Sequence, residues 1–212
     1  MKFKHKYKRM IWVVAGLCLL LVIGSVITIV SIDGYQYHQN QKIIQSITET
    51  VTPSNTLVVF FSRSGNTELM ARKIADIKKA HVFPITSSQY RIGVKGWVQA
   101  LQDARNTEAQ ITPSKIDLAP YDTIYIGSPI WLYSPAPPAF QFARNNDFSG
   151  KVVVLFNTMN SKFEQYYIDE FKKLIEKNGG TFLQHIYIIR GRMTQQMDIN
   201  TFLNEVEQKL KI

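Results

Sequence analysis

The sequence predicts a doubly wound α/β domain with a five-stranded parallel sheet, preceded by one transmembrane helix. Short apolar segments alternate with segments of helical periodicity after residue 55, which is typical of a parallel sheet covered on both faces. The first strand runs into a loop of small hydroxyl residues, which favours the strand order 2-1-3-4-5. Near the N-terminus, Ile11 to Val30 form an uncharged stretch long enough to cross a bilayer.

Basic residues gather at only one end of this uncharged stretch. Five lysines and arginines and no acidic residue precede it, and the next basic residues are Lys42 and Arg63. This asymmetry predicts a single-pass anchor in the cell membrane, with residues 1–10 as a basic cytoplasmic tail and the C-terminal domain extracytoplasmic. Two alternatives stay open. One is a cleaved signal peptide, although no Ala-x-Ala-like site follows; the other is a domain in the cytoplasm.

Composition divides the rest of the chain into a polar stalk, residues 31–54, and one domain, residues 55–212. Thr52-Pro53-Ser54-Asn55 breaks any helix and marks the boundary. Five of the 25 basic residues lie in the tail, which leaves 20 against 16 acidic residues, or +4 of the net +9. No basic cluster interleaved with aromatics follows, so we expect no nucleic-acid binding. The single cysteine, Cys18, lies in the apolar stretch, so the domain has no disulfide and no catalytic thiol.

Each element of the domain follows from its own pattern. The expected strands are 57–61, 81–85, 123–127, 152–156 and 182–189, and the expected helices are 68–79, 94–101, 138–144, 163–174 and 199–210. Pro84 cannot donate to a ladder and suits an edge strand. A proline begins the helix at 138, and Gly179-Gly180 end the helix before the last strand.

The loop after the first strand predicts an anion site. It consists of Ser62, Arg63, Ser64, Gly65, Asn66 and Thr67. Between a strand end and a helix N-terminus, backbone N–H groups and the helix dipole converge on one point, which favours a phosphate. A plain capped turn is the alternative, and the loop matches neither a Walker loop nor a dinucleotide fingerprint. Arg63 either adds charge to the phosphate or points to solvent, and we expect solvent.

The loop after the third strand indicates the rest of the ligand. It begins Ser128, Pro129, Ile130, Trp131, Leu132 and Tyr133, and several prolines stiffen it. The first and third strands end side by side where the strand order reverses, so this loop is expected beside the phosphate loop. A rigid Trp131 there suits stacking on a flat ring. The alternative is that Trp131 packs against the core.

Together these segments resemble the flavodoxin family. The matching stretches are TLVVFFSRSGNTELMARKIA, YDTIYIGSPIWLYSPAPPAF and DFSGKVVVLFNT, in the family's order and spacing over residues 55–212. The resemblance implies a flavodoxin-like fold and noncovalent FMN, with the phosphate on residues 62–67. It also implies that the isoalloxazine ring lies against residues 128–133, with Trp131 as the stacking residue. A third contact is implied after the fourth strand, at Asn157, Thr158 and Met159.

Three departures from the family leave two functions open. The third loop, residues 157–161, has no glycine; the domain is mildly basic where familiar flavodoxins are acidic; and an anchor precedes it. One hypothesis is a membrane-anchored FMN protein that carries electrons between a redox partner or membrane quinone and an external acceptor, or acts as an FMN-dependent reductase. The other is a degenerate flavodoxin fold without flavin that serves as an anchored binding or assembly module. We expect no catalytic residue and no metal, and His185, in an apolar strand, is expected to pack.

Overall fold

The computed structural model describes residues 2–47, 53–192 and 195–211. Its centre is a parallel sheet in the order β2-β1-β3-β5-β6. The strands are β1 Thr56–Phe60, β2 His81–Pro84, β3 Thr123–Trp131, β5 Val152–Met159 and β6 Thr181–Ile189. A two-residue strand, β4 (Ser134–Pro135), pairs antiparallel with the end of β3. Counted without β4, this is the expected 2-1-3-4-5 order, with β2 and its Pro84 at one edge.

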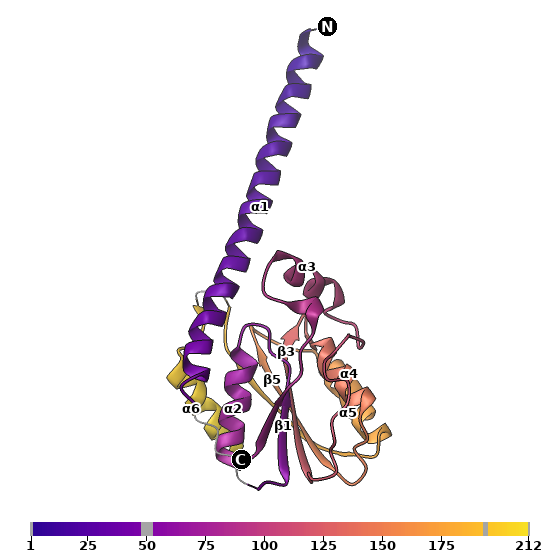
Figure 1. Cartoon of the computed structure of the whole chain (residues 1–212). Helices are drawn as coiled ribbons and strands as arrows, with labels where there is room; N and C mark the ends of the chain where they lie inside the picture. Colours follow the sequence, from indigo (N-terminus) through magenta and orange to yellow (C-terminus); the bar gives the residue numbers. More distant parts are fainter. Residues whose placement is uncertain (1, 48–52, 193–194, 212) are drawn as a thin grey trace.

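Helices cover both faces of the sheet (Figure 1). The helices α2 (Asn66–Lys78) and α6 (Ile199–Leu210) pack on one face, around buried residues such as Ile74 and Phe202. The helices α4 (Pro137–Asn145) and α5 (Gln165–Lys177) pack on the other, around Phe140 and Phe171. Two apolar cores therefore hold the sheet between them, as the doubly wound pattern requires.

The N-terminal helix α1 runs without a break from Lys2 to Ile44, and Tyr7–Ile44 is long and apolar enough to cross a membrane. Most of the uncharged stretch is exposed and extends away from the domain, and only its last residues, among them Ile29, lie beside it (Figure 1). The end of the helix is different, because Asn40 and Ile44 are buried beside α2. The helix therefore continues through most of the polar segment and joins the core of the domain.

The carboxyl ends of the strands meet at the edge of the sheet from which α1 departs. At that edge lie the short 3₁₀ turn η1 (Ser88–Tyr90) and α3 (Val94–Asp103), close to α1 (Figure 1). A Cβ placed on Gly34 of α1 would lie 4.0 Å from Ile92, just before α3. Residues of α1, α3 and the loops that follow β1, β3 and β5 therefore lie close together at this edge of the sheet.

Candidate functional site

The loop after β1 adopts the conformation that an anion site needs. Helix α2 begins at Asn66, and Gly65 precedes it with φ at +90° and its N–H donated to the Ser62 hydroxyl at 3.1 Å. The first N–H groups of α2 have no carbonyl acceptor within the helix, so they are available to a ligand. Thr67 is buried, and its hydroxyl lies 2.8 Å from the Thr158 hydroxyl at the end of β5. This contact joins the loop after β1 to the end of β5.

Helix α1 fastens the same loop from the outside. The buried Asn40 side-chain amide donates to the Ser64 carbonyl at 2.8 Å and to the Asn66 side-chain oxygen at 2.9 Å. A Cβ on residue 65 would lie 2.7 Å from the Asn40 Cβ. Gly65 is therefore required twice, by its positive φ and by the approach of α1.

Arg63 does not point to solvent, so that expectation was wrong. Its side chain is only 10% exposed and forms an ion pair with Asp33 of α1. The physical reason is that α1 folds over the loop and supplies a carboxylate that the loop alone does not reveal. Burial lowers the pKa of the Arg63 guanidinium, and the Asp33 carboxylate opposes this shift. The buried Nε and Nη2 of Arg63 have no hydrogen-bond acceptor among the described residues.

A second buried cation, Arg190, directly follows β6. Arg190 is only 4% exposed, and its guanidinium lies 4.9 Å from the centre of the Phe202 ring. Its Nε donates to the Asn66 side-chain oxygen at 3.4 Å, while its buried Nη1 lacks an acceptor in the part of the chain that the structure describes. Burial lowers the pKa of Arg190 and nearby Asp198 opposes the shift, yet a guanidinium stays protonated at neutral pH. A buried charge with a free donor calls for an anionic partner.

Trp131 forms the aromatic side of the site. It packs edge-on against Phe61, with ring centres 5.7 Å apart, and against Tyr90 at 5.1 Å, and it remains partly exposed at the end of β3. It therefore both contacts the core and lines the site. After it, Leu132 and Tyr133 take positive φ values of +42° and +79° and turn the chain tightly into β4.

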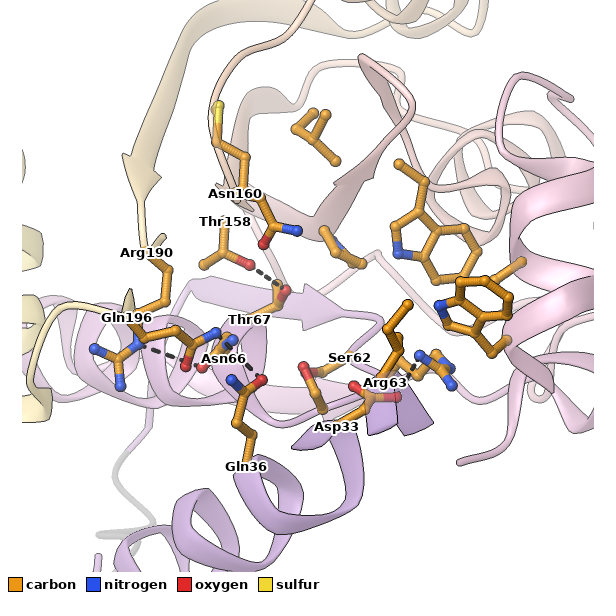
Figure 2. Close-up of a pocket in the computed structure, with 18 of the residues that line it drawn as sticks. Asp33, Gln36, Ser62, Arg63, Asn66, Thr67, Thr158, Asn160, Arg190 and Gln196 are labelled. Atoms are coloured by element: carbon orange, nitrogen blue, oxygen red, sulfur yellow. Dashed lines mark hydrogen bonds and ion pairs between the residues drawn. The ribbon is translucent and has the colours of Figure 1, made fainter. Parts of the chain in front are cut away.

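These groups line one pocket of about 320 Å³, a volume within the range of small-molecule sites. Figure 2 shows Arg190 and Arg63 on opposite sides of Asn66, Thr67 and Ser62. Eleven of the fifteen predicted site residues line it: Ser62, Arg63, Ser64, Asn66, Thr67, Pro129, Ile130, Trp131, Leu132, Thr158 and Met159.

The other four predicted residues support the pocket or lie outside its wall. Gly65 lies under Asn40. The Asn157 amide donates to the Ser128 carbonyl at 2.7 Å and to its hydroxyl at 3.1 Å, which joins β5 to β3. Tyr133 faces two cations instead, the Arg105 and Lys162 side chains.

Sequence reasoning missed a further group of lining residues that come from distant segments. They are Ile29, Ile32, Asp33 and Gln36 of α1, Trp97, Ala100 and Leu101 of α3, and Asn160, Arg190 and Gln196. Two signals were available. Asp33, Gln36 and Asn40 recur at helical spacing, and Arg190 stands directly after the last strand, at the edge where ligands bind in such sheets.

The arrangement suits a ligand with a phosphate at one end and a flat ring at the other. Hydroxyl and amide side chains and two arginines line the pocket beside the N-terminus of α2, together with indole and aliphatic side chains. Within residues 2–47, 53–192 and 195–211, no group of three or more His, Cys, Asp or Glu side chains is placed to hold a metal ion. The fold and the site thus define a doubly wound α/β protein with a site for a phosphorylated aromatic ligand.

The comparison with known families identifies the class more closely. A family model described as flavodoxin matches residues 55–206, so the chain belongs to the flavodoxin family. Flavodoxin 1 of Escherichia coli (strain K12) is 28% identical over 138 residues, which cover 61% of this chain and 66% of that protein. Flavodoxin 1 of Salmonella typhimurium (strain LT2) matches with the same identity and coverage. The chain thus spans just under two thirds of the length of these curated relatives.

Solved structures agree with this assignment. A putative flavoprotein from Bacteroides uniformis has a TM-score of 0.60 and 22% identity, covering 76% of this chain and 100% of its own. A flavoprotein in complex with FMN from Lactobacillus acidophilus has a TM-score of 0.50 and 25% identity, covering 63% of this chain and 92% of its own. The first of these likenesses establishes the fold alone.

Proposed function

We propose that this chain is a membrane-anchored flavodoxin that binds FMN noncovalently and carries electrons at the membrane. The observation that carries the proposal is the pair of buried arginines with free N–H groups, Arg63 and Arg190, in the same pocket as the phosphate loop and Trp131. FMN joins a phosphate to a flat ring system, so it fits both ends of that pocket. Membership of the flavodoxin family and the FMN complex of the Lactobacillus acidophilus flavoprotein support the same cofactor.

Different residues of the pocket would bind the phosphate and the ring of FMN. The phosphate is bound by the N-terminus of α2, by Ser62, Ser64, Asn66 and Thr67, and by the two arginines. Ile130, Trp131, Leu132 and Met159 line the pocket as well and would contact the ring, while Thr158 is paired with Thr67 of the phosphate loop. Bound FMN supplies one- and two-electron transfer. Ser128 and Asn157 support the pocket without lining it, because their hydrogen bonds hold β3 and β5 together beneath the two loops.

Electron carriage is favoured over acid–base chemistry on a specific substrate. The ionisable side chains that line the pocket are Asp33, Arg63 and Arg190, and Asp33 is held by Arg63. His185 lies on β6 beside Asn157, and burial lowers its pKa to about 4, so it is neutral at physiological pH. A flavin-dependent reductase acting on quinones or nitro compounds is the second form of the same proposal, because it needs only the bound flavin.

The position of the pocket favours a donor dissolved in the membrane. Ile29 belongs to the uncharged stretch of α1 and also lines the pocket, together with Ile32. With α1 across the bilayer and its basic end in the cytoplasm, the pocket lies at the extracytoplasmic surface. A membrane quinol would reach it without leaving the lipid phase, and an external acceptor would take the electrons.

The first test is an absorption spectrum of the purified full-length protein, followed by titration with FMN. We expect a yellow protein, or saturable quenching of flavin fluorescence. Trp131→Ala should weaken this binding, whereas Tyr166→Ala, which removes an exposed ring on α5, should not. A colourless protein that leaves FMN fluorescence unchanged would support the alternative, a degenerate fold that acts as an anchored binding module.

The electron-carrying role needs a separate measurement. The FMN-loaded protein is reconstituted in liposomes, a reduced quinone is added under anaerobic conditions, and flavin absorbance is followed. Bleaching of the oxidised flavin band is the expected result. A protein that binds FMN but is not reduced by any quinol would contradict the proposed donor and leave FMN binding standing.

A further inference from the structure

Helix α3 carries an apolar face that the domain does not cover. Val94, Val98 and Leu101 are 48%, 39% and 41% exposed, and Ile92, just before the helix, is 36% exposed. The three helical residues stand at positions i, i+4 and i+7, so their side chains lie on one face. Single exposed apolar residues are ordinary, but a row of them on one helix needs a partner.

The charges around α3 indicate what kind of partner this is. Arg91 and Lys95 are exposed at the start of α3. Arg105 is exposed too, but it donates to the Leu132 carbonyl and lies over the Tyr133 ring, and Asp103 accepts hydrogen bonds from Tyr90 and Gln99. A helix with a strong apolar face, a tryptophan at position 97 and flanking cations has the pattern of a segment that lies in a membrane interface.

The position of α3 along α1 agrees with that pattern. The uncharged stretch ends at Val30, and Gly34, one helical turn later, approaches Ile92 at the start of α3. At 1.5 Å per residue, Gly34 lies about 6 Å beyond the end of the uncharged stretch, within the depth of a headgroup region. Leu101 and Trp97 also line the same pocket as Ile29 and Ile32 of α1.

We propose that α3 is a second membrane contact, which docks on a lipid surface containing anionic phospholipids. Val94, Val98 and Leu101 enter the interface, and Arg91 and Lys95 meet the lipid phosphates. This inference rests on α1 spanning the membrane. Its consequence is that the domain leans on the bilayer on the side of α3, and the mouth of the pocket between α1 and α3 opens at the lipid surface.

The test measures the depth of α3 in nanodiscs that hold the full-length protein and nitroxide-labelled anionic lipid. A fluorophore is placed on a single cysteine, Val98→Cys, in a Cys18→Ser background, and in parallel on Val94→Cys. The control site is Lys177→Cys, exposed at the end of α5 where the strands begin. We expect at least twofold stronger quenching at positions 94 and 98 than at 177. Equal quenching at all three positions would overturn the inference.

A label on the native cysteine distinguishes failure of the proposed membrane anchor from failure of the proposed docking of α3. Cys18 lies in the uncharged stretch and is exposed, so a label on it should be quenched by lipid nitroxides whenever α1 spans the bilayer. Quenching at Cys18 without quenching at 94 and 98 would overturn the role of α3 and leave the anchor in place. Absence of quenching at Cys18 would overturn both.

A charge change should release α3 without disturbing the pocket. Val94→Glu combined with Lys95→Glu alters two exposed residues that do not line the pocket. With the label on Val98→Cys, we expect quenching to fall by at least half while FMN affinity stays within twofold. Lys172→Glu on α5 is the matched control and should leave quenching unchanged. Undiminished quenching in the double variant would contradict docking through this face.

Discussion

Arg190 is a buried cation with few partners among the described residues. A guanidinium that is almost fully buried loses its hydration, and this loss is offset only by partners. Here the partners are a ring, one long hydrogen bond to Asn66 and a screened Asp198. A phosphate dianion beside Asn66 would satisfy the free Nη1 and compensate the charge.

Arg190→Gln should therefore weaken FMN but not riboflavin, which has the same ring and no phosphate. A hydrogen bond to a charged group contributes about 1.5–3 kcal/mol, so we expect about a 10- to 100-fold rise in the Kd for FMN. Fluorescence titration of both flavins measures this. Arg192→Gln, an exposed arginine two residues later, is the control. Equal losses for FMN and riboflavin would show that Arg190 does not act on the phosphate.

The buried His185 is expected to lower the free energy of unfolding at acid pH. The Asn157 amide nitrogen donates to Ser128, so its oxygen is the acceptor for the His185 Nε2–H at 2.8 Å, and the ring is held neutral. Burial lowers its pKa to about 4 from 6.5. Between these values the unfolded chain binds a proton that the folded chain does not, so the free energy of unfolding falls as pH drops from about 6.5 towards 4.

The expected loss from this residue is at most about 3 kcal/mol, and it should vanish in His185→Gln. Urea unfolding at a series of pH values between 4 and 7 measures it. His38→Gln, an exposed histidine on α1, is the matched control and should keep the slope of the native chain. A slope that persists unchanged in His185→Gln would mean that other groups cause the acid sensitivity.

At the scale of elements, the contact between α1 and the phosphate loop is the feature that sets this chain apart from a bare α/β domain. Asn40, on helix α1, donates a hydrogen bond to the Ser64 carbonyl of the loop. The absence of a side chain on Gly65 allows Asn40 to approach this closely. The loop conformation and the packing of α1 are thus coupled, and a change in one should be felt in the other.

Gly65→Ala tests this coupling. The positive φ alone costs an L-residue about 1–2 kcal/mol, and the new Cβ would also collide with Asn40. Gly150→Ala is matched, because its φ is +73° but its Cβ would meet open space. We expect Gly65→Ala to lower thermal stability more than Gly150→Ala and to weaken FMN by about tenfold or more, or about 1.4 kcal/mol. Similar losses in the two variants would argue against a tight contact with α1.

The elements that could be predicted from the sequence are those that depend on residues close together in the chain. The strands, the helix starts and the loops at Ser62 and Trp131 depend on short patterns, and the family pattern confirmed the fold. Arg63 was misjudged because its partner, Asp33, comes from a helix whose position depends on tertiary packing. The apolar face of α3 was visible in the sequence, but whether the domain covers it depended on the placement of α1.

At the scale of the whole molecule, the proposed orientation across the membrane follows from charge alone. Five basic residues precede the uncharged stretch and none of the acidic ones do. We expect a reporter enzyme that works only outside the cytoplasm to be active when fused after residue 212. The same fusion with the five basic residues replaced by Gln is the control and should lose this preference. Activity of a cytoplasmic reporter alone would contradict the orientation.

The unbroken course of α1 also limits the reach of the molecule. Its 43 residues form a rod of about 64 Å, and the ten residues from Val30 to Asn40 span about 15 Å. In the proposed orientation there is no flexible tether between the bilayer and the phosphate loop, so the flavin stays at a fixed height and cannot swing out to a distant protein. Any electron acceptor must come to the membrane, and the geometry of its approach is set by a helix rather than by diffusion of the carrier.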